Sequence, residues 1–154
     1  MTAINHPQNV QGADRKQGMA KKLTGGCLCG AVTFSIEDRL KAFYLCHCKQ
    51  CRQLTGTAFA SNITTDKDNI NWDSGHGNVS VFEHSSREFS KSFCKLCGSA
   101  LPFINKSKTS LVIPAGSLNE MPEMKPQANI FTDEEARWLS DGVKAESFPA
   151  FVDK

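Results

Sequence analysis

Seven cysteines in three short groups constrain this sequence more than any other feature. The groups are Cys27-Leu28-Cys29, Cys46-His47-Cys48-Lys49-Gln50-Cys51 and Cys94-Lys95-Leu96-Cys97. An odd number of thiols cannot pair completely into disulfides, and a bridge between Cys27 and Cys29 would close a small, strained ring. We see no apolar export signal near residue 1, so we expect a cytoplasmic, reducing location where thiols serve metal or redox chemistry.

The seven thiols divide naturally into four and three. Four thiolates complete a tetrahedral structural zinc site, whereas three leave one position open for water or substrate. Cys46, Cys48 and Cys51 lie within one short segment, so a single folded-back turn can direct their sulfurs to one point. The alternative division pairs the first group with the first two thiols of the second group, and it leaves the remaining thiol with the third group. The spacing favours the first division without excluding the second, and either predicts two zinc ions per chain.

Hydrophobic patterning predicts an antiparallel, mostly β domain. Val32, Phe34 and Ile36 alternate with polar residues, as on a half-buried strand. Similar segments recur between turns, and we expect further strands at 42–46, 57–64, 79–81, 89–93, 101–104 and 111–114. Thr132 and Glu135 match a helix capping box, which predicts one short helix that ends near Gly142.

Length and composition favour a single globular domain. The chain has 154 residues, 40% of them hydrophobic, and its 18 basic and 16 acidic residues give a net charge of +2. This balance gives no reason to expect a nucleic-acid partner, and no apolar run is long enough to cross a membrane. Residues 1–22 lack an apolar pattern, so we expect a mobile N-terminal tail followed by one zinc-binding domain at 23–154.

The cysteine groups and their neighbours resemble the glutathione-dependent formaldehyde-activating enzyme family. The resemblance lies in 26–32, in 46–52 with Gly56, in 93–98 with Leu101, and in 115–118 with a later aromatic residue at Trp138. It covers about residues 23–140 and implies a β-tent fold of two or three small antiparallel sheets. It also implies a structural zinc ion held by Cys27, Cys29, Cys94 and Cys97, and a catalytic zinc ion held by Cys46, Cys48 and Cys51.

The resemblance further implies an activity. Members of the family add glutathione reversibly to formaldehyde and give S-(hydroxymethyl)glutathione, a reaction classed as carbon–sulfur lyase chemistry. A small, glutathione-like thiol is therefore the expected partner, and we expect an enzyme. Two positions depart from the family pattern, because Asn119 replaces a common aspartate and Asn129 replaces a common histidine. Both residues are expected near the substrate pocket, where they put the identity of the substrate in question.

The residues themselves suggest how such a site would work. A zinc ion held by three thiolates is a mild Lewis acid that suits capture of a soft thiol, whose pKa would fall below its free value of about 8.5. Our hypothesis is thiol activation at Cys46, Cys48 and Cys51. We expect His47 to point away from the metal, and we interpret Arg52 as a solvated side chain in preference to a carboxylate-binding one.

Two other classes of function remain open at this point. One is a non-catalytic zinc-binding interaction module, in which protein ligands would complete every metal site. The other is a thiol redox switch, in which oxidation of the second cysteine group ejects the metal reversibly. The open ligand position and the response to mild oxidant distinguish these alternatives from the lyase.

Overall fold

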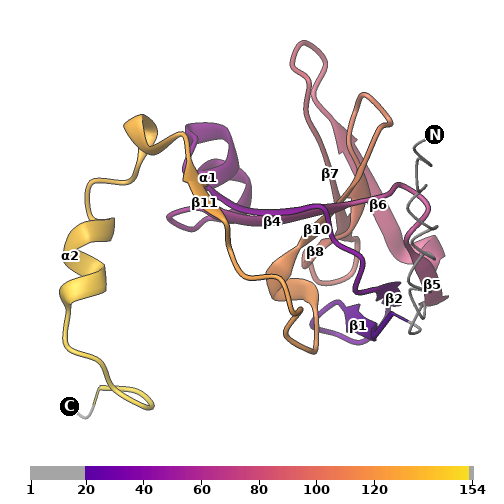
Figure 1. Cartoon of the computed structure of the whole chain (residues 1–154), viewed down its shortest axis with the longest axis horizontal. Coiled ribbons are helices and arrows are strands. Elements are labelled where there is room, and N and C mark those ends of the chain that lie inside the picture. Colours follow the sequence, from indigo (N-terminus) through magenta and orange to yellow (C-terminus); the bar gives the residue numbers. More distant parts are fainter. Residues whose placement is uncertain (1–19, 153–154) are drawn as a thin grey trace, which may run out of the picture.

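The structure is a computed structural model that describes residues 20–152, and it consists mainly of three small sheets (Figure 1). The first sheet has the strand order β1-β2-β5, with β1 (Lys22–Gly26), β2 (Thr33–Glu37) and β5 (Asn71–Ser74). The five-stranded sheet contains, in spatial order, β11 (Ala128–Ile130), β3 (Ala42–Cys46), β4 (Ala60–Thr65), β10 (Leu111–Pro114) and β9 (Phe103–Ile104). The third sheet contains β6 (Val79–Glu83), β7 (Ser90–Cys94) and β8 (Ala100–Leu101).

Helices are short in the described part of the chain. The two α-helices are α1 (Lys49–Thr55) and α2 (Leu139–Lys144), and three 3₁₀ turns are η1 (His76–Asn78), η2 (Ala115–Ser117) and η3 (Thr132–Glu134). The prediction of a mostly β fold with small sheets and a short C-terminal helix is confirmed. Figure 1 shows that α2 lies on a segment that leads away from the sheets. No helix among residues 20–152 is long and apolar enough to span a membrane.

The inward faces of the three sheets form one hydrophobic core. Its members are fully or almost fully buried: Leu23, Cys27, Val32, Phe34, Ile36, Phe43, Ile63, Cys94, Leu101, Leu111 and Ile113. Burial of each large aliphatic or aromatic side chain contributes about 1.5–3 kcal/mol, so this cluster is the main apolar source of stability. Because Cys94 belongs to the core, the third cysteine group is anchored at the point where the sheets meet.

Strand boundaries differ from the prediction where local chemistry overrides the hydrophobic pattern. The strand expected at 57–64 begins at Ala60, because α1 and its following turn occupy the preceding residues. The strand expected at 101–104 is split at Pro102, which has no N–H to donate. In β7 the buried face carries Ser90 and Ser92, while Lys91 is only half buried.

One pair of neighbouring strands is parallel, which the sequence did not predict. β11 pairs with β3 so that Ala128 lies opposite Tyr44 and Ile130 lies opposite Cys46. All other paired strands described here are antiparallel. The parallel pair places the chain after residue 128 beside the second cysteine group, far from it in sequence.

The predicted C-terminal helix is wrong in its extent. Thr132–Glu134 forms the turn η3 without a side-chain cap, and the backbone at Glu135 is extended, so α2 starts only at Leu139 and contains Gly142. The expected capping box does not form, because the carboxylates of Glu134 and Glu135 face the second cysteine group instead. The prediction also lacked α1 entirely.

The structure does not test the predicted domain division. Residues 1–19 of the expected 1–22 tail lie outside the described residues, and β1 already begins at Lys22. The single zinc-binding domain at 23–154 therefore remains a prediction.

Candidate metal centres and thiol pocket

The first and third cysteine groups meet in one four-sulfur cluster. The sulfurs of Cys27, Cys29, Cys94 and Cys97 all lie within 4.8 Å of one another. The sulfur of Cys29 lies 3.5 Å from that of Cys27 and 3.9 Å from that of Cys94. A tetrahedral zinc ion with Zn–S bonds of about 2.3 Å separates its sulfurs by about 3.8 Å, so these spacings suit such an ion.

A glycine allows the backbone to turn back after each half of this cluster. Gly30 and Gly98 have φ angles of 74° and 75°, in the left-handed region that other residues adopt only with strain. The N–H of Gly30 donates to the Cys27 carbonyl, and the N–H of Gly98 donates to the Cys94 carbonyl. The two halves therefore form similar tight turns that bring their sulfurs together.

Hydrogen-bond donors also point at these sulfurs. The N–H of Val32 donates to Cys27 Sγ over 3.3 Å, and the Ser99 hydroxyl lies 3.2 Å from Cys97 Sγ. Ser99 Oγ in addition accepts the N–H of Leu28. The Ser99 hydroxyl is the largest of the influences that lower the pKa of Cys97 to about 6. Such donors favour the thiolate, which is the form that binds metal.

The second cysteine group forms a separate three-sulfur cluster. Cys46 ends β3, Cys48 is the N-cap of α1 and Cys51 lies in the first turn of that helix. Their sulfurs lie within 4.8 Å of one another, and no fourth Cys, His, Asp or Glu from residues 20–152 joins the group. The N–H of Cys51 donates to Cys48 Sγ over 3.4 Å. The start of a helix, and not an irregular turn, therefore brings these sulfurs together.

The donor chemistry of the three-sulfur cluster fits a soft divalent metal. Burial raises the pKa of the Cys46 thiol, and burial together with the neighbouring thiols raises the pKa of Cys51. Three thiolates so close together in a partly buried position need a cation to balance their charge. A metal such as zinc would displace the protons and supply that charge.

All seven cysteines thus lie in the four-and-three division that the spacing favoured, and within the described residues the mixed alternative does not occur. His47 belongs to neither cluster, although two cysteines flank it. Its side chain is only 2% exposed, and its Nε2 lies 3.1 Å from Asn129 Oδ1. Its Nδ1 has no hydrogen-bond partner among residues 20–152 and lies 3.7 Å from a carboxylate oxygen of Glu135.

Residues from β11 and η3 hold the three-sulfur cluster in place. The N–H of His47 donates to the Ile130 carbonyl over 2.9 Å, and the N–H of Lys49 donates to Glu134 Oε2 over 2.7 Å. The second contact satisfies one of the free N–H groups at the start of α1. Arg52 is half buried and its Nε donates to the His47 carbonyl, so the expectation of a solvated arginine was wrong.

A pocket of about 510 Å³ lies between the two cysteine clusters. Cys27 and Leu28 of the four-sulfur cluster form part of its wall, and Cys51 of the three-sulfur cluster forms another part. Its size is that of a typical small-molecule site. Other lining residues are Leu54, Thr55, Thr57, Phe59, Ser61, Asn62, Phe89, Lys91, Ser99, Phe103, Ser117, Leu118 and Asn119.

Only one of the two departures from the family pattern touches this pocket. Asn119 is part of the wall, and its side chain donates to the Thr24 hydroxyl. Asn129 is not part of the wall, but it contacts His47 beside the three-sulfur cluster. Arg52 also lies outside the wall, so it does not serve this pocket directly.

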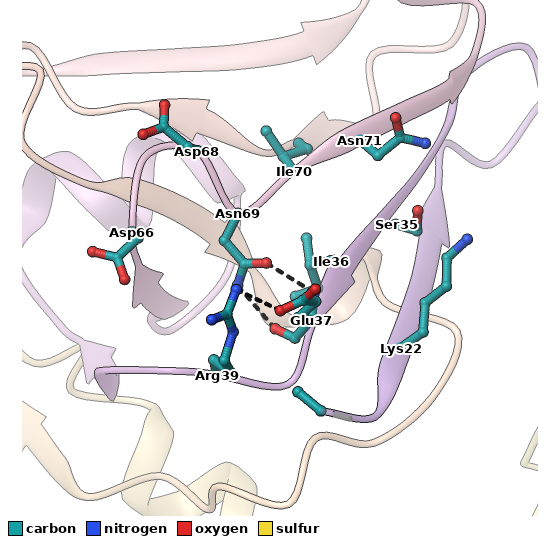
Figure 2. Close-up of a pocket in the computed structure, with 11 residues that line it drawn as sticks. Lys22, Ser35, Ile36, Glu37, Arg39, Asp66, Asp68, Asn69, Ile70 and Asn71 are labelled. Atoms are coloured by element: carbon teal, nitrogen blue, oxygen red, sulfur yellow. Dashed lines mark hydrogen bonds and ion pairs between the residues drawn. The ribbon is translucent and has the colours of Figure 1, made fainter. Parts of the chain in front are cut away.

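A larger hollow of about 920 Å³ lies elsewhere, on the first sheet and the turn before β5 (Figure 2). No cysteine lines it. Its polar groups contact one another, because Asn69 exchanges two hydrogen bonds with the backbone of Glu37, and Arg39 forms an ion pair with the same residue. Chemistry and not size therefore singles out the smaller pocket as the candidate site.

Comparison with known proteins gives the wider context of this geometry. The sequence profile described as glutathione-dependent formaldehyde-activating enzyme matches residues 22–134, which include all seven cysteines. The chain belongs to this family. The match of the formaldehyde-activating enzyme family ends before α2, so the C-terminal segment lies outside it.

Solved structures support the fold. A Rhodobacter sphaeroides protein, solved in crystals as a structural genomics target, superposes with a TM-score of 0.52 at 22% identity. The superposition covers 69% of this chain and 98% of the other. A comparison with curated protein sequences finds no match.

Proposed function

We propose that this protein is a zinc-dependent carbon–sulfur lyase that activates a small, glutathione-like thiol for reversible addition to formaldehyde or a similar aldehyde. The supporting observation is that three sulfurs converge at the wall of a 510 Å³ pocket through Cys51. The other four sulfurs form a group that can complete a metal site without substrate. Membership of the formaldehyde-activating enzyme family supports the choice of thiol and aldehyde.

In this proposal the two clusters have different roles. Cys27, Cys29, Cys94 and Cys97 hold a structural zinc ion that joins β1, β2 and β7. Cys46, Cys48 and Cys51 hold the catalytic zinc ion and are the catalytic residues. A zinc ion held there supplies Lewis acidity that lowers the pKa of a bound thiol.

The chain itself orients the reactants. Cys51 presents the three-sulfur cluster to the pocket, and Leu54, Phe59 and Phe103 give the pocket apolar walls. The substrate thiol gives its proton to solvent, its sulfur forms a bond to the aldehyde carbon, and the carbonyl oxygen takes up a proton. The product hemithioacetal breaks down by the same steps in reverse.

Metal counting combined with an exchange assay tests the proposal. We expect two zinc ions per chain in the native protein, and nuclear magnetic resonance should show glutathione–formaldehyde exchange above the spontaneous rate. Cys48→Ser should lose one zinc ion and the accelerated exchange, while its far-ultraviolet circular dichroism stays native. Cys97→Ser is the matched control, because it should weaken the other metal site and the fold.

Two results would contradict the proposal. One is a Cys48→Ser protein that keeps both zinc ions and the full exchange rate. The other is a native protein that holds two zinc ions without any acceleration, which would favour a non-catalytic binding module.

A further inference from the structure

The pocket between the cysteine clusters has one cationic side chain on its wall, beside Cys27 and Cys51 of the two clusters. Among the described residues that line it, Lys91 is the only basic one, and none is an aspartate or glutamate. Lys91 projects from β7, where it is half buried opposite Phe82. In the described part of the chain, its ammonium forms no ion pair with a carboxylate. A partly buried cation without a counterion raises the energy of the empty pocket and favours an anionic ligand.

One hydrogen bond fixes the position of this ammonium near the three-sulfur cluster. Lys91 Nζ donates to the Leu54 carbonyl over 2.6 Å, which leaves two further N–H groups of the ammonium available. Leu54 lies three residues after Cys51 on α1, a rise of about 4.5 Å along the helix. The cation is therefore held at the C-terminal end of α1, the helix whose first turn carries Cys51.

We propose that Lys91 binds a carboxylate of the substrate, so that the pocket selects mercapto-carboxylic acids over neutral thiols. This inference rests on the proposed function, because it assumes that the sulfur of the ligand is held at the three-sulfur cluster. Apart from Cys27 and Cys51, whose thiolates the proposed zinc ions would bind, the polar groups on the wall, such as Ser61, Asn62 and Asn119, are neutral. Glutathione belongs to the selected class because it carries carboxylates.

Lys91 also has a structural role that the test must separate from substrate binding. Its bond to Leu54 satisfies a carbonyl in the last turn of α1, where carbonyls have no partner within the helix. Lys91→Gln keeps an N–H donor but removes the charge, whereas Lys91→Arg keeps the charge. Lys106→Gln is the matched control, because Lys106 Nζ donates to the His84 and Arg87 carbonyls and does not line the pocket.

The experiment compares two probes that differ in one group, 3-mercaptopropionate and 3-mercaptopropionamide. Isothermal titration calorimetry of the zinc-loaded protein gives a Kd for each. We expect the native protein to bind the acid about tenfold more tightly than the amide, as a partly exposed charge-assisted hydrogen bond provides. Lys91→Gln should remove this preference without changing the Kd of the amide. Lys91→Arg and Lys106→Gln should keep the preference.

The possible outcomes separate the two proposals. If the native protein binds both thiols equally well, the role of Lys91 is wrong while thiol binding stands. A preference for the acid that survives in Lys91→Gln likewise refutes only the role of Lys91. If neither thiol binds to zinc-loaded protein at millimolar concentration, both the proposed function and the role of Lys91 are wrong.

Discussion

The buried imidazole of His47 links the three-sulfur cluster to β11, and a double-mutant cycle can measure this link. The cycle uses Asn129→Ala, His47→Phe and the double variant. A neutral hydrogen bond contributes about 0.5–1.5 kcal/mol, and a buried polar group without a partner costs about 1–3 kcal/mol. His47 is 2% exposed and its Nδ1 already has no hydrogen-bond partner in the described part of the chain, so Asn129→Ala would leave both ring nitrogens without one there. We expect this variant to lose about 1.5 kcal/mol of unfolding free energy.

The His47→Phe variant is the second arm of the cycle, which measures the coupling energy between His47 and Asn129. A phenyl ring keeps the contact with Phe59, whose ring centre lies 5.2 Å from that of His47, and it needs no hydrogen bond. Once His47 is replaced, the Asn129→Ala change should cost little more. Urea unfolding of zinc-loaded protein should therefore give a coupling energy of about 1 kcal/mol between the two positions.

The same link should control how fast the three-sulfur cluster releases metal. The backbone of His47 joins Cys46 to Cys48, so loss of the hydrogen bond that holds the His47 side chain should let the segment 46–48 open more often. With about 1 kcal/mol less resistance to local opening, Asn129→Ala should release one zinc ion to a coloured chelator about fivefold faster. The control is Asn105→Ala, whose side chain accepts hydrogen bonds from Thr109 and Ser110 away from both clusters. Additive free energies within about 0.3 kcal/mol, or unchanged zinc release in Asn129→Ala, would refute the link.

Two further predictions concern the cysteine clusters. Glu134→Gln should lower the free energy of unfolding in urea by about 0.5 kcal/mol and make it less dependent on salt, because the variant has no carboxylate at the N-terminus of α1. An unchanged urea midpoint at low salt would show that this contact does not stabilise the protein. Complete chelation of metal should unfold the protein or strongly lower its melting temperature, because binding of a structural metal contributes directly to folding. Circular dichroism follows the melting, and an unaltered melting curve after verified zinc removal would exclude this coupling.

The three-sulfur cluster was predictable because it depends on local spacing, whereas the spacing only favoured the meeting of the first and third groups, which lie 65 residues apart at Cys29 and Cys94. Each group is short enough for one turn to gather its thiols, and the total of seven favours a division into four and three. Helix α1 escaped prediction because its seven residues have no apolar periodicity. Its signals were Gly56 in a left-handed C-cap and a cysteine at the N-cap, a position where serine, threonine, aspartate or asparagine is more usual.

The contacts that complete the site depend on long-range pairing, which local patterns do not encode. Glu135 has the spacing of a capping box with Thr132, and Glu134 suits a helix start, yet their carboxylates contact His47 and Lys49, far earlier in the chain. Only the parallel pairing of β11 with β3 brings them there. Likewise, the alternation in β7 predicts a strand, but only the packing against α1 directs Lys91 to the Leu54 carbonyl and to the pocket.

The positions of the two cysteine clusters along the chain determine the order in which each cluster has all its thiols during translation. As the ribosome releases the nascent polypeptide, the three-sulfur cluster has all its thiols once Cys51 emerges, whereas Cys27 and Cys29 must wait for Cys94 and Cys97. On the proposed metal loading, Cys27 and Cys29 remain free thiols during that interval and are open to oxidation. Maturation of the four-sulfur cluster would then depend on the supply of reductant and metal to the growing chain.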